Sequence, residues 1–392
     1  MNLLFIICGS IAIKKCPEIL KNLSNSKIYI NCIITKNAQI MTKINKVEKI
    51  INGKIYLDSS EKNNKMLHIR LTRKADLIVV CPATANIIAK YANGYANDLA
   101  STALIASDKQ VVFIPAMNVE MWNNSINQQN VLKLKKIGVE FVGPEYGYLS
   151  CKEIGLGRLS DTNKICEIIL MYLNKSQTFK NKKCLVTAGP TVEAIDPIRY
   201  FSNHSSGKQG YEIARQLMLC GARVILISGP TNIQAPSKIK LINVKTAKEM
   251  HLAVKKCAEA KVDVGIFTAA VSDVSPKYQK YSKIKKEELN TISFKKTPDI
   301  LKYVSSIKKN RPKIVIGFAA ETDDCLANAE LKLLSKKCDA IVVNKITFRN
   351  KIFGADENKV SIISKNKTIH LKKMTKLNVA KEIVQFIDNF IN

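Results

Sequence analysis

Apolar runs of four to eight residues alternate with amphipathic stretches along most of the chain. This alternation is typical of buried parallel strands that are connected by crossover helices. In the first half we expect helices at residues 11–23, 85–92 and 126–136. The expected strands of this half lie at residues 3–8, 28–35, 77–81, 111–115 and 139–142.

The polar and basic segment "NKSQTFKNKK", from Asn174 to Lys183, interrupts this pattern and reads as a linker. Beyond it we expect strands at residues 184–187, 224–228, 241–244, 264–268, 314–318 and 340–343. After Lys359 we expect two short strands and then a helix, Lys376–Ile391. We therefore predict two doubly wound α/β domains, Rossmann-like or flavodoxin-like, with mostly parallel sheets. Their predicted bounds are residues 1–174 and 184–392, with a linker at 175–183. In such folds ligands bind beyond the carboxyl ends of the strands.

Composition narrows the class of protein. The net charge of +30 would suit nucleic acid, because lysines displace counterions from phosphates. The lysines are spread along the whole chain, so a lysine-rich surface explains them better, and we expect neither nucleic acid nor a membrane as partner. No segment approaches the roughly 20 apolar residues of a membrane span, and the start does not resemble a signal peptide. The eleven cysteines form no C-x-x-C pair, which favours a cytoplasmic protein without a zinc site or disulfide framework.

Unusual residues follow the expected strands of the first half. "CGSIA" is a small-residue turn that opens a helix and suits a phosphate. "CPATAN" and "PAMNVEMW" place the polar side chains of Thr84 and Asn118 at strand ends. A single histidine or cysteine, such as His68 or Cys151, is more often structural than catalytic. In the second half, "SNHSSGKQG" is not a Walker A loop, because Ser202 and Gln209 occupy its first glycine and hydroxyl positions.

The order of these motifs resembles the flavin-containing cysteine decarboxylases, in particular the phosphopantothenoylcysteine decarboxylase half of the bacterial coenzyme A enzyme. The resemblance rests on "CGSIA", "HIRLTRKADLIVVCPATANIIAKYANGYANDLAST", "PAMNVEMW" and "CKEIGLGRL". It implies FMN as cofactor, which oxidises the cysteine thiol of the substrate to a thioaldehyde so that carbon dioxide can leave. It also implies that His68 is a base, Asn118 holds the substrate carboxylate and Cys151 protonates the enethiol. The flavin would be lined by Gly9, Ser10, Ile11, Thr35, Thr84 and Ser101.

The second half resembles phosphopantothenate–cysteine ligase through "TAGPTVEAIDPIRYFSNHSSGKQG", "TAAVSD", "KIKK", "TPDI" and "GFAAET". The resemblance implies that a nucleoside triphosphate, CTP in bacterial relatives, activates phosphopantothenate with Mg²⁺ and that cysteine then displaces the nucleotide. Asn203 and Lys283 would handle the acyl-nucleotide, and Arg199 the substrate. The nucleotide would contact Asp273, Lys283, Thr297, Pro298, Asp299, Ile300, Phe318, Lys332 and Lys336. The sequence alone does not distinguish CTP from ATP, and it identifies no metal ligands.

The sequence departs from the family pattern at Cys8, at Val192 and in the loop of Cys151, where Lys152, Glu153 and Leu156 replace commoner residues. The alternative function is a non-catalytic, flavin-binding regulatory protein of the same superfamily, against which the retained His68, Asn118 and Cys151 argue. The resemblance also implies a homo-oligomer, because flavin sites of this family lie between subunits. Trimers built into a larger shell are implied for the first domain and dimers for the second.

Overall fold

The structure is a computed structural model that describes residues 1–42, 44–62, 66–236, 238–285, 292–346 and 355–391. The chain divides into two compact units, Met1–Lys175 and Ser176–Asn392. None of the helices within these described residues is long and apolar enough to cross a membrane.

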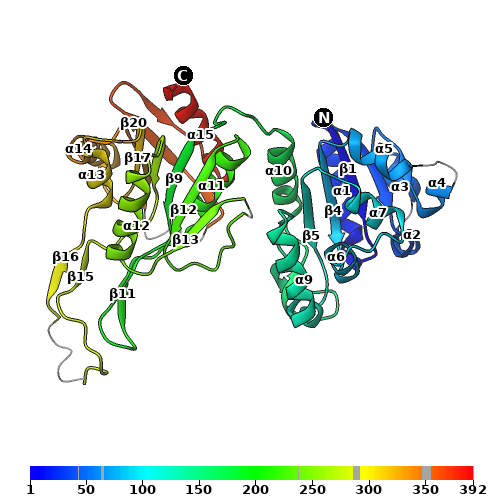
Figure 1. Cartoon of the computed structure of the whole chain (residues 1–392), viewed down its shortest axis with the longest axis horizontal. Helices are drawn as coiled ribbons and strands as arrows, with labels where there is room; N and C mark the ends of the chain where they lie inside the picture. Colours follow the sequence, from blue (N-terminus) through cyan, green and yellow to red (C-terminus); the bar gives the residue numbers. More distant parts are fainter. Residues whose placement is uncertain (43, 63–65, 237, 286–291, 347–354, 392) are drawn as a thin grey trace. The chain divides into compact units, whose positions relative to one another are not determined.

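A parallel sheet of six strands forms the centre of the first unit, in the order β3-β2-β1-β4-β5-β6 (Figure 1). The chain runs outward from β1 to β3 and then returns to β4 on the other side of β1. Such a reversal is the topological switch point at which doubly wound sheets bind ligands. The strands are β1 (Asn2–Ile7), β2 (Tyr29–Ile34), β3 (Ile55–Tyr56), β4 (Leu77–Ala83), β5 (Val111–Pro115) and β6 (Glu140–Phe141).

Helices cover both faces of this sheet because successive strand residues point to opposite sides. Leu4 and Ile6 of β1 pack with α5 (Leu67–Lys74), α6 (Ala85–Ala92), α7 (Leu99–Ile105) and α9 (Ser125–Lys136). Leu3 and Phe5 point to the other face, where α1 (Cys16–Ser24) packs on α10 (Thr162–Leu173). The shorter elements are η1 (Ile11–Lys15), α2 (Lys36–Met41), α3 (Ile44–Glu48), α4 (Asp58–Lys62), α8 (Val119–Asn123), β7 (Glu145–Tyr148) and β8 (Ile154–Arg158).

The second unit contains an eight-stranded sheet in the order β13-β12-β9-β14-β17-β18-β20-β21. The first six strands in this order are parallel, whereas β20 and β21 run antiparallel to their neighbours. The bounds are β9 (Lys183–Ala188), β12 (Arg223–Ser228), β13 (Lys240–Asn243), β14 (Val264–Phe267), β17 (Ile314–Glu321), β18 (Ala340–Lys345), β20 (Val360–Ser364) and β21 (Thr368–His370). The predicted α/β class with mostly parallel sheets is confirmed.

Two separate cores hold the helices of the second unit on the two faces of the sheet. Val186 of β9 packs with α11 (Lys208–Leu219) and α15 (Lys376–Ile391). Leu185, its neighbour, packs with α12 (Ala247–Glu259), α13 (Ile300–Ser305) and α14 (Cys325–Lys336) on the other face. Small two-stranded sheets are formed by β10 (Val192–Ala194) with β11 (Tyr200–Ser202), β15 (Val274–Pro276) with β16 (Phe294–Lys296), and β19 (Glu357–Asn358) with β22 (Met374–Thr375).

The polar segment between the predicted domains packs on the second unit. Phe179 is 2% exposed and its backbone N–H donates to the carbonyl of Cys220 at 2.8 Å. One buried aromatic residue therefore anchors a segment whose composition is that of a linker.

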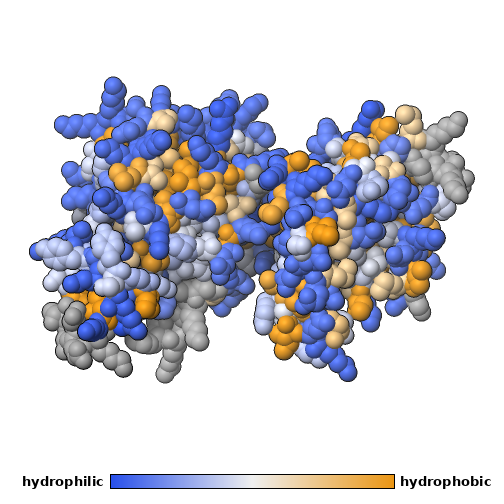
Figure 2. Space-filling view, turned by 60° about the horizontal axis from the view of Figure 1, so that its bottom comes forward, coloured by the Kyte–Doolittle hydropathy of each residue, from blue (hydrophilic) through white to orange (hydrophobic). Residues whose placement is uncertain are grey.

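Hydrophilic residues cover most of the face seen in Figure 2, and apolar residues appear on it in smaller groups.

Candidate active sites

A cavity of about 600 Å³ lies in the first unit at the carboxyl ends of β1, β2, β4 and β5. Four of the residues predicted to line the flavin meet there, namely Gly9 and Ser10 after β1, Thr35 after β2 and Thr84 before α6. The volume lies within the range of pockets that hold small molecules and cofactors. The structure therefore gathers residues from three segments of the chain around one space that fits a cofactor.

Two hydroxyl groups at this cavity join the loops that surround it. Ser10 Oγ donates to the carbonyl of Ala116 after β5 at 3.2 Å and accepts from the N–H of Ala12 at 3.4 Å. Thr35 Oγ1 donates to the carbonyl of Ile7 at 3.2 Å. These bonds hold the strand-end loops in fixed positions, as a preorganised binding site requires.

The same cavity is lined by charged residues that the sequence analysis missed, among them Lys90 and Asp98. Their side chains form an ion pair, and Asp98 also accepts the N–H of Ser101 at 2.7 Å as the N-cap of α7. Burial opposes ionisation of Asp98, but hydrogen bonds from Lys90 and Ser101 outweigh it, so the pKa of Asp98 lies below its ordinary value. The spacing of an aspartate three residues before a serine is a capping signal that could have revealed this pair.

Five predicted residues of the first unit do not line this cavity. Ser101 is fully buried behind Asp98, and Ile11 is half exposed at the start of η1. His68 is half-buried on α5, which is a separate element from the cavity loops. Asn118 caps α8 by accepting the N–H of Met121 at 2.8 Å, while Cys151 lies in the exposed turn between β7 and β8.

The hairpin of β7 and β8 connects the turn of Cys151 to the loop of Asn118. Its residue Gly157 accepts a hydrogen bond from the N–H of Met117 at 3.1 Å. A Cβ atom on Gly157 would lie 2.2 Å from the Met117 carbonyl oxygen, so this contact depends on glycine. The base of the hairpin is thereby fixed beside Asn118, and its turn exposes the Cys151 thiol.

Cys8, one departure from the family pattern, also lines the cavity of the first unit. Its side chain is buried, and this burial raises the pKa of the Cys8 thiol well above its usual range. Cys8 is therefore a neutral thiol, which is a weak hydrogen-bonding group.

A second cavity, of about 150 Å³, lies in the other unit where β14, β17 and β18 end and α11 begins. Phe318 is the member of the predicted nucleotide set that lines it. The remaining lining consists of residues that the sequence analysis did not select for binding: Ser205, Ser206, Gly207, Lys208, Gln209, Gly210, Thr268, Ala269, Ala270, Ala319, Ala320, Asn344, Asn358 and Lys376.

Two glycines of "SNHSSGKQG" place the start of α11 at this cavity. Gly207 has a φ of 75°, a left-handed conformation that glycine adopts without strain. A Cβ atom on Gly210 would lie 2.4 Å from Thr268 Oγ1 and 2.6 Å from Ala188 Cβ. The helix therefore approaches the ends of β9 and β14 more closely than any larger residue permits.

Asn203 lies beside this second cavity. Its Nδ2 donates to the carbonyl oxygens of Val271 at 3.0 Å and Ala270 at 3.5 Å, and Ala270 lines the cavity. The residue is exposed. An amide in this position can bind a polar group of a ligand.

Asp196 connects Arg199 to the segment that carries Lys283. Arg199 Nη1 lies 3.0 Å from Asp196 Oδ2, and the N–H of Ile284 donates to the same oxygen at 3.2 Å. Burial opposes ionisation of Asp196, but the N–H groups of Ile198, Arg199 and Ile284 and the Arg199 charge lower its pKa. Lys283 itself is exposed.

The remaining predicted nucleotide residues form a strip around α13 and α14. Asp299 caps α13 by accepting the N–H of Lys302 at 3.0 Å, and its other oxygen pairs with Lys336. Lys332 pairs with Glu321 at 2.6 Å. Both lysines expected to reach a triphosphate therefore have acidic partners. In the same strip the N–H of Thr297 donates to the Asp273 carbonyl, Pro298 is exposed, and Ile300 is buried.

No group of three or more histidine, cysteine, aspartate or glutamate residues among the described parts of the chain is arranged to hold a metal ion. Mg²⁺ in nucleotide sites is usually held by one or two carboxylates together with substrate phosphates.

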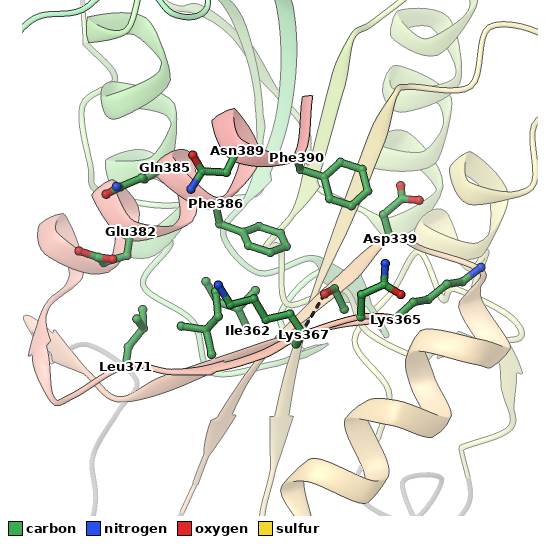
Figure 3. A pocket seen from close by; sticks show the side chains of 13 residues that line it. Asp339, Ile362, Lys365, Lys367, Leu371, Glu382, Gln385, Phe386, Asn389 and Phe390 are labelled. Atoms are coloured by element: carbon green, nitrogen blue, oxygen red, sulfur yellow. Dashed lines mark hydrogen bonds between the residues drawn. The ribbon is translucent and has the colours of Figure 1, made fainter. Parts of the chain in front are cut away.

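Another cavity of the second unit, about 480 Å³ in volume, lies between α15 and the hairpin of β20 and β21. Figure 3 shows Phe386 and Phe390 projecting from α15 toward this hairpin. The hairpin turn is closed by a hydrogen bond of 2.9 Å from Ser364 Oγ to the Lys367 carbonyl. None of the predicted site residues lines this cavity.

Comparison with known proteins gives matches over both units. A family model described as "Flavoprotein" matches residues 1–174, and one described as "DNA/pantothenate metabolism flavoprotein C-terminal domain" matches residues 179–390. A protein of Borreliella burgdorferi named "Coenzyme A biosynthesis bifunctional protein CoaBC" is 39% identical over 390 residues, covering 98% of both chains. A Bacillus subtilis protein of the same name is 38% identical, covering 98% of this chain and 96% of its own. A solved C-terminal domain of such a protein is 38% identical with a TM-score of 0.47, covering 55% of this chain and 98% of its own.

Proposed function

The chain belongs to the family of coenzyme A biosynthesis bifunctional proteins, which have a decarboxylase part and a ligase part, and we propose how its residues divide these two activities. Residues 184–392 join 4′-phosphopantothenate to cysteine at the expense of CTP, through an acyl-cytidylate. Residues 1–174 decarboxylate the resulting phosphopantothenoylcysteine to 4′-phosphopantetheine.

The cavity of about 600 Å³ in the first unit holds FMN in this proposal. Bound FMN would take two electrons from the substrate thiol to form a C=S group that accepts the electron pair when carbon dioxide leaves, and would return two electrons after the enethiol has been protonated. Gly9, Ser10, Thr35 and Thr84 hold the cofactor at the strand ends. Ser101 acts indirectly, because it fixes Asp98 at the cavity wall, and Ile11 begins the short helix that follows Ser10.

Three further residues act on the substrate of the decarboxylase. His68 serves as the base, since an imidazole titrates near neutral pH. Asn118 holds the carboxylate with a neutral amide, which does not trap the negative charge that must depart. Cys151 donates a proton to the enethiol. The three lie on separate elements, namely α5, the N-cap of α8 and the turn between β7 and β8.

The ligase half uses the amide of Asn203 and the ammonium group of Lys283 to stabilise the acyl-cytidylate, with Arg199 on the substrate side. The nucleotide lies along Asp273, Thr297, Pro298, Asp299, Ile300, Phe318, Lys332 and Lys336, and Mg²⁺ enters with its phosphates. Preorganised hydrogen-bond donors of this kind stabilise charge that develops during acyl transfer.

We also propose a cytoplasmic location and a homo-oligomeric state. All eleven cysteines are free thiols, which fits a reducing compartment. The oligomer is expected from the family, in which flavin sites lie between subunits.

The observation that carries the proposal is the convergence of Gly9, Ser10, Thr35 and Thr84 on one cavity at the switch point of a sheet that matches the flavoprotein family. The test supplies purified protein with 4′-phosphopantothenate, cysteine, CTP, Mg²⁺ and FMN. We expect a yellow protein that releases pyrophosphate and carbon dioxide. Release of neither product by the flavin-loaded protein would overturn the proposal, and replacement of CTP by ATP tests the nucleotide.

A further inference from the structure

The small cavity of the second unit carries positive charge. Lys208 and Lys376 are the charged members of its lining, and none of the described residues that line it is acidic. Both lysines come from the starts of helices, α11 and α15 respectively. A cavity lined by two cations and no acid favours an anionic ligand.

The backbone of Lys376 is fixed between two other parts of the site. Its carbonyl accepts a hydrogen bond from Gln209 Nε2 at 3.0 Å, and its N–H donates to the Asp356 carbonyl at 2.8 Å. The residue is 7% exposed, although lysine is rarely buried in proteins. Figure 1 shows α15 lying beside α11, so the C-terminal helix delivers this lysine to the loop before α11.

The carboxylate of Asp356 forms an ion pair with Lys208 and also attracts the charge of Lys376. Asp356 Oδ1 lies 2.7 Å from Lys208 Nζ, and its side chain is 75% exposed. Burial, followed by the charge of Lys208, lowers the pKa of Lys376 to about 8, and Asp356 only partly opposes these effects. A bound anion would favour the charged form of both lysines.

The loop before α11 offers hydrogen-bond donors to the same ligand. α11 begins after Gly207, an N-cap residue that has no side chain, and contains twelve residues. N–H groups at a helix start bind phosphate groups well, and the first residues of α11 line the same cavity as the two lysines.

We propose that Lys376 is a binding residue of the ligase site that holds a substrate phosphate together with Lys208 and the loop before α11. This inference rests on the proposed ligase activity. The phosphate belongs either to the nucleotide or to 4′-phosphopantothenate, and the kinetic experiment separates these two sources.

The test compares the flavin-loaded full chain with its Lys376→Met variant by pyrophosphate release. Because a charge-assisted hydrogen bond to phosphate is lost, we expect the KM of one phosphorylated substrate to rise about tenfold or more, with a smaller change in kcat. A higher KM for CTP assigns the phosphate to the nucleotide, and a higher KM for 4′-phosphopantothenate assigns it to the acid. Lys376→Arg should have a KM between those of Lys376→Met and wild type. Lys381→Met, an exposed position of the same helix, should match wild type.

A second measurement distinguishes binding from a structural role. Inorganic pyrophosphate should raise the Tm of wild type more than that of the variant. Unchanged KM values for both substrates, or an equal stabilisation by pyrophosphate, would overturn the inference. Absence of pyrophosphate release from wild type would instead contradict the ligase function itself.

Discussion

Arg199 Nη1 donates a hydrogen bond to the carbonyl oxygen of Ile284 at 3.1 Å, although the two residues are 85 positions apart in the chain. The N–H of Ile284 donates in turn to Asp196, the ion-pair partner of Arg199. Both polar groups of the Ile284 backbone are therefore held by this ion pair. Because Lys283 immediately precedes Ile284, Arg199 contributes to the position of the lysine that we propose to act on the acyl-cytidylate.

We expect Arg199→Met to reduce ligase turnover roughly tenfold, since small displacements of catalytic groups lower rates strongly. The segment at Lys283 should also become more accessible, so trypsin should cleave after Lys283 faster than in wild type. Arg223→Met, at an exposed position of β12, is the matched control and should change neither property. Wild-type turnover and cleavage in Arg199→Met would show that Asp196 holds the segment without the arginine.

Asp98 lines the cavity that we propose to hold FMN, and its charge makes the stability of the first unit depend on pH. Its pKa is lowered in the folded protein from an ordinary value of 3.8, so its ionised form stabilises the fold. This contribution is fully present above pH 3.8 and is lost as the pH falls below that value toward the lowered pKa. Asp98→Asn should therefore destabilise the first unit by about 1 kcal/mol at pH 7, a typical effect of an altered N-cap and ion pair.

Thermal unfolding of the flavin-loaded protein between pH 7 and the acid range checks this prediction. The difference in stability between wild type and Asp98→Asn should shrink as the pH falls through the acid range, and the variant should release FMN more readily. Asp108→Asn is the control, because the Asp108 side chain is 85% exposed and pairs with its neighbour Lys109. A stability difference that stays constant in acid would contradict the role of the Asp98 charge.

The strands were predictable because each buried strand is a continuous apolar run. The strand at Val111–Pro115 and the helices at Ala85–Ala92 and Lys376–Ile391 have the predicted bounds. Elsewhere the predicted ends differ from the observed ones by one to three residues. The expected helix over residues 11–23 is split into η1 and α1, with Pro17 near the start of α1. The motifs likewise identified the family, which the comparisons confirm.

The partners of the site residues were not predictable from local patterns. Lys332 and Lys336 lie four residues apart on α14, yet the acids that pair with them come from β17 and from the start of α13. Lys376 reaches its cavity only because α15 packs beside α11. Contacts of this kind depend on tertiary packing across long stretches of chain, which periodicity does not encode.

Cys151 should be the cysteine that reacts first with an alkylating agent. It is the exposed thiol of the eleven, whereas Cys325 is half-buried and the other nine are buried. Burial raises the pKa of Cys166 and of Cys338 to about 11, which keeps these thiols unreactive. We therefore expect one equivalent of iodoacetamide to stop formation of 4′-phosphopantetheine at the enethiol, after carbon dioxide has left, and to leave pyrophosphate release intact.

Mass spectrometry of peptides from the treated protein identifies the modified residue. Cys151→Ser should resist the first equivalent and should itself fail to complete decarboxylation, while Cys325→Ser should behave as wild type toward the reagent. Full conversion of the substrate to 4′-phosphopantetheine by Cys151→Ser would contradict the proton-donating role proposed for this residue. Modification of a buried cysteine before Cys151 would contradict the accessibility seen in the structure.

Gly210 allows α11 to approach the carboxyl ends of β9 and β14, and a methyl group there would overlap Thr268 and Ala188. We expect Gly210→Ala to destabilise the second unit by about 1–3 kcal/mol, as overpacking of a close contact does. The displaced helix start should also lower pyrophosphate release while the FMN spectrum stays unchanged. Gly94→Ala is the control, because a Cβ atom there meets open space and adds only the strain of its left-handed φ of 74°. Chemical denaturation and pyrophosphate assays of the two variants test this, and normal ligase activity in a stable Gly210→Ala protein would show that the site tolerates movement of α11.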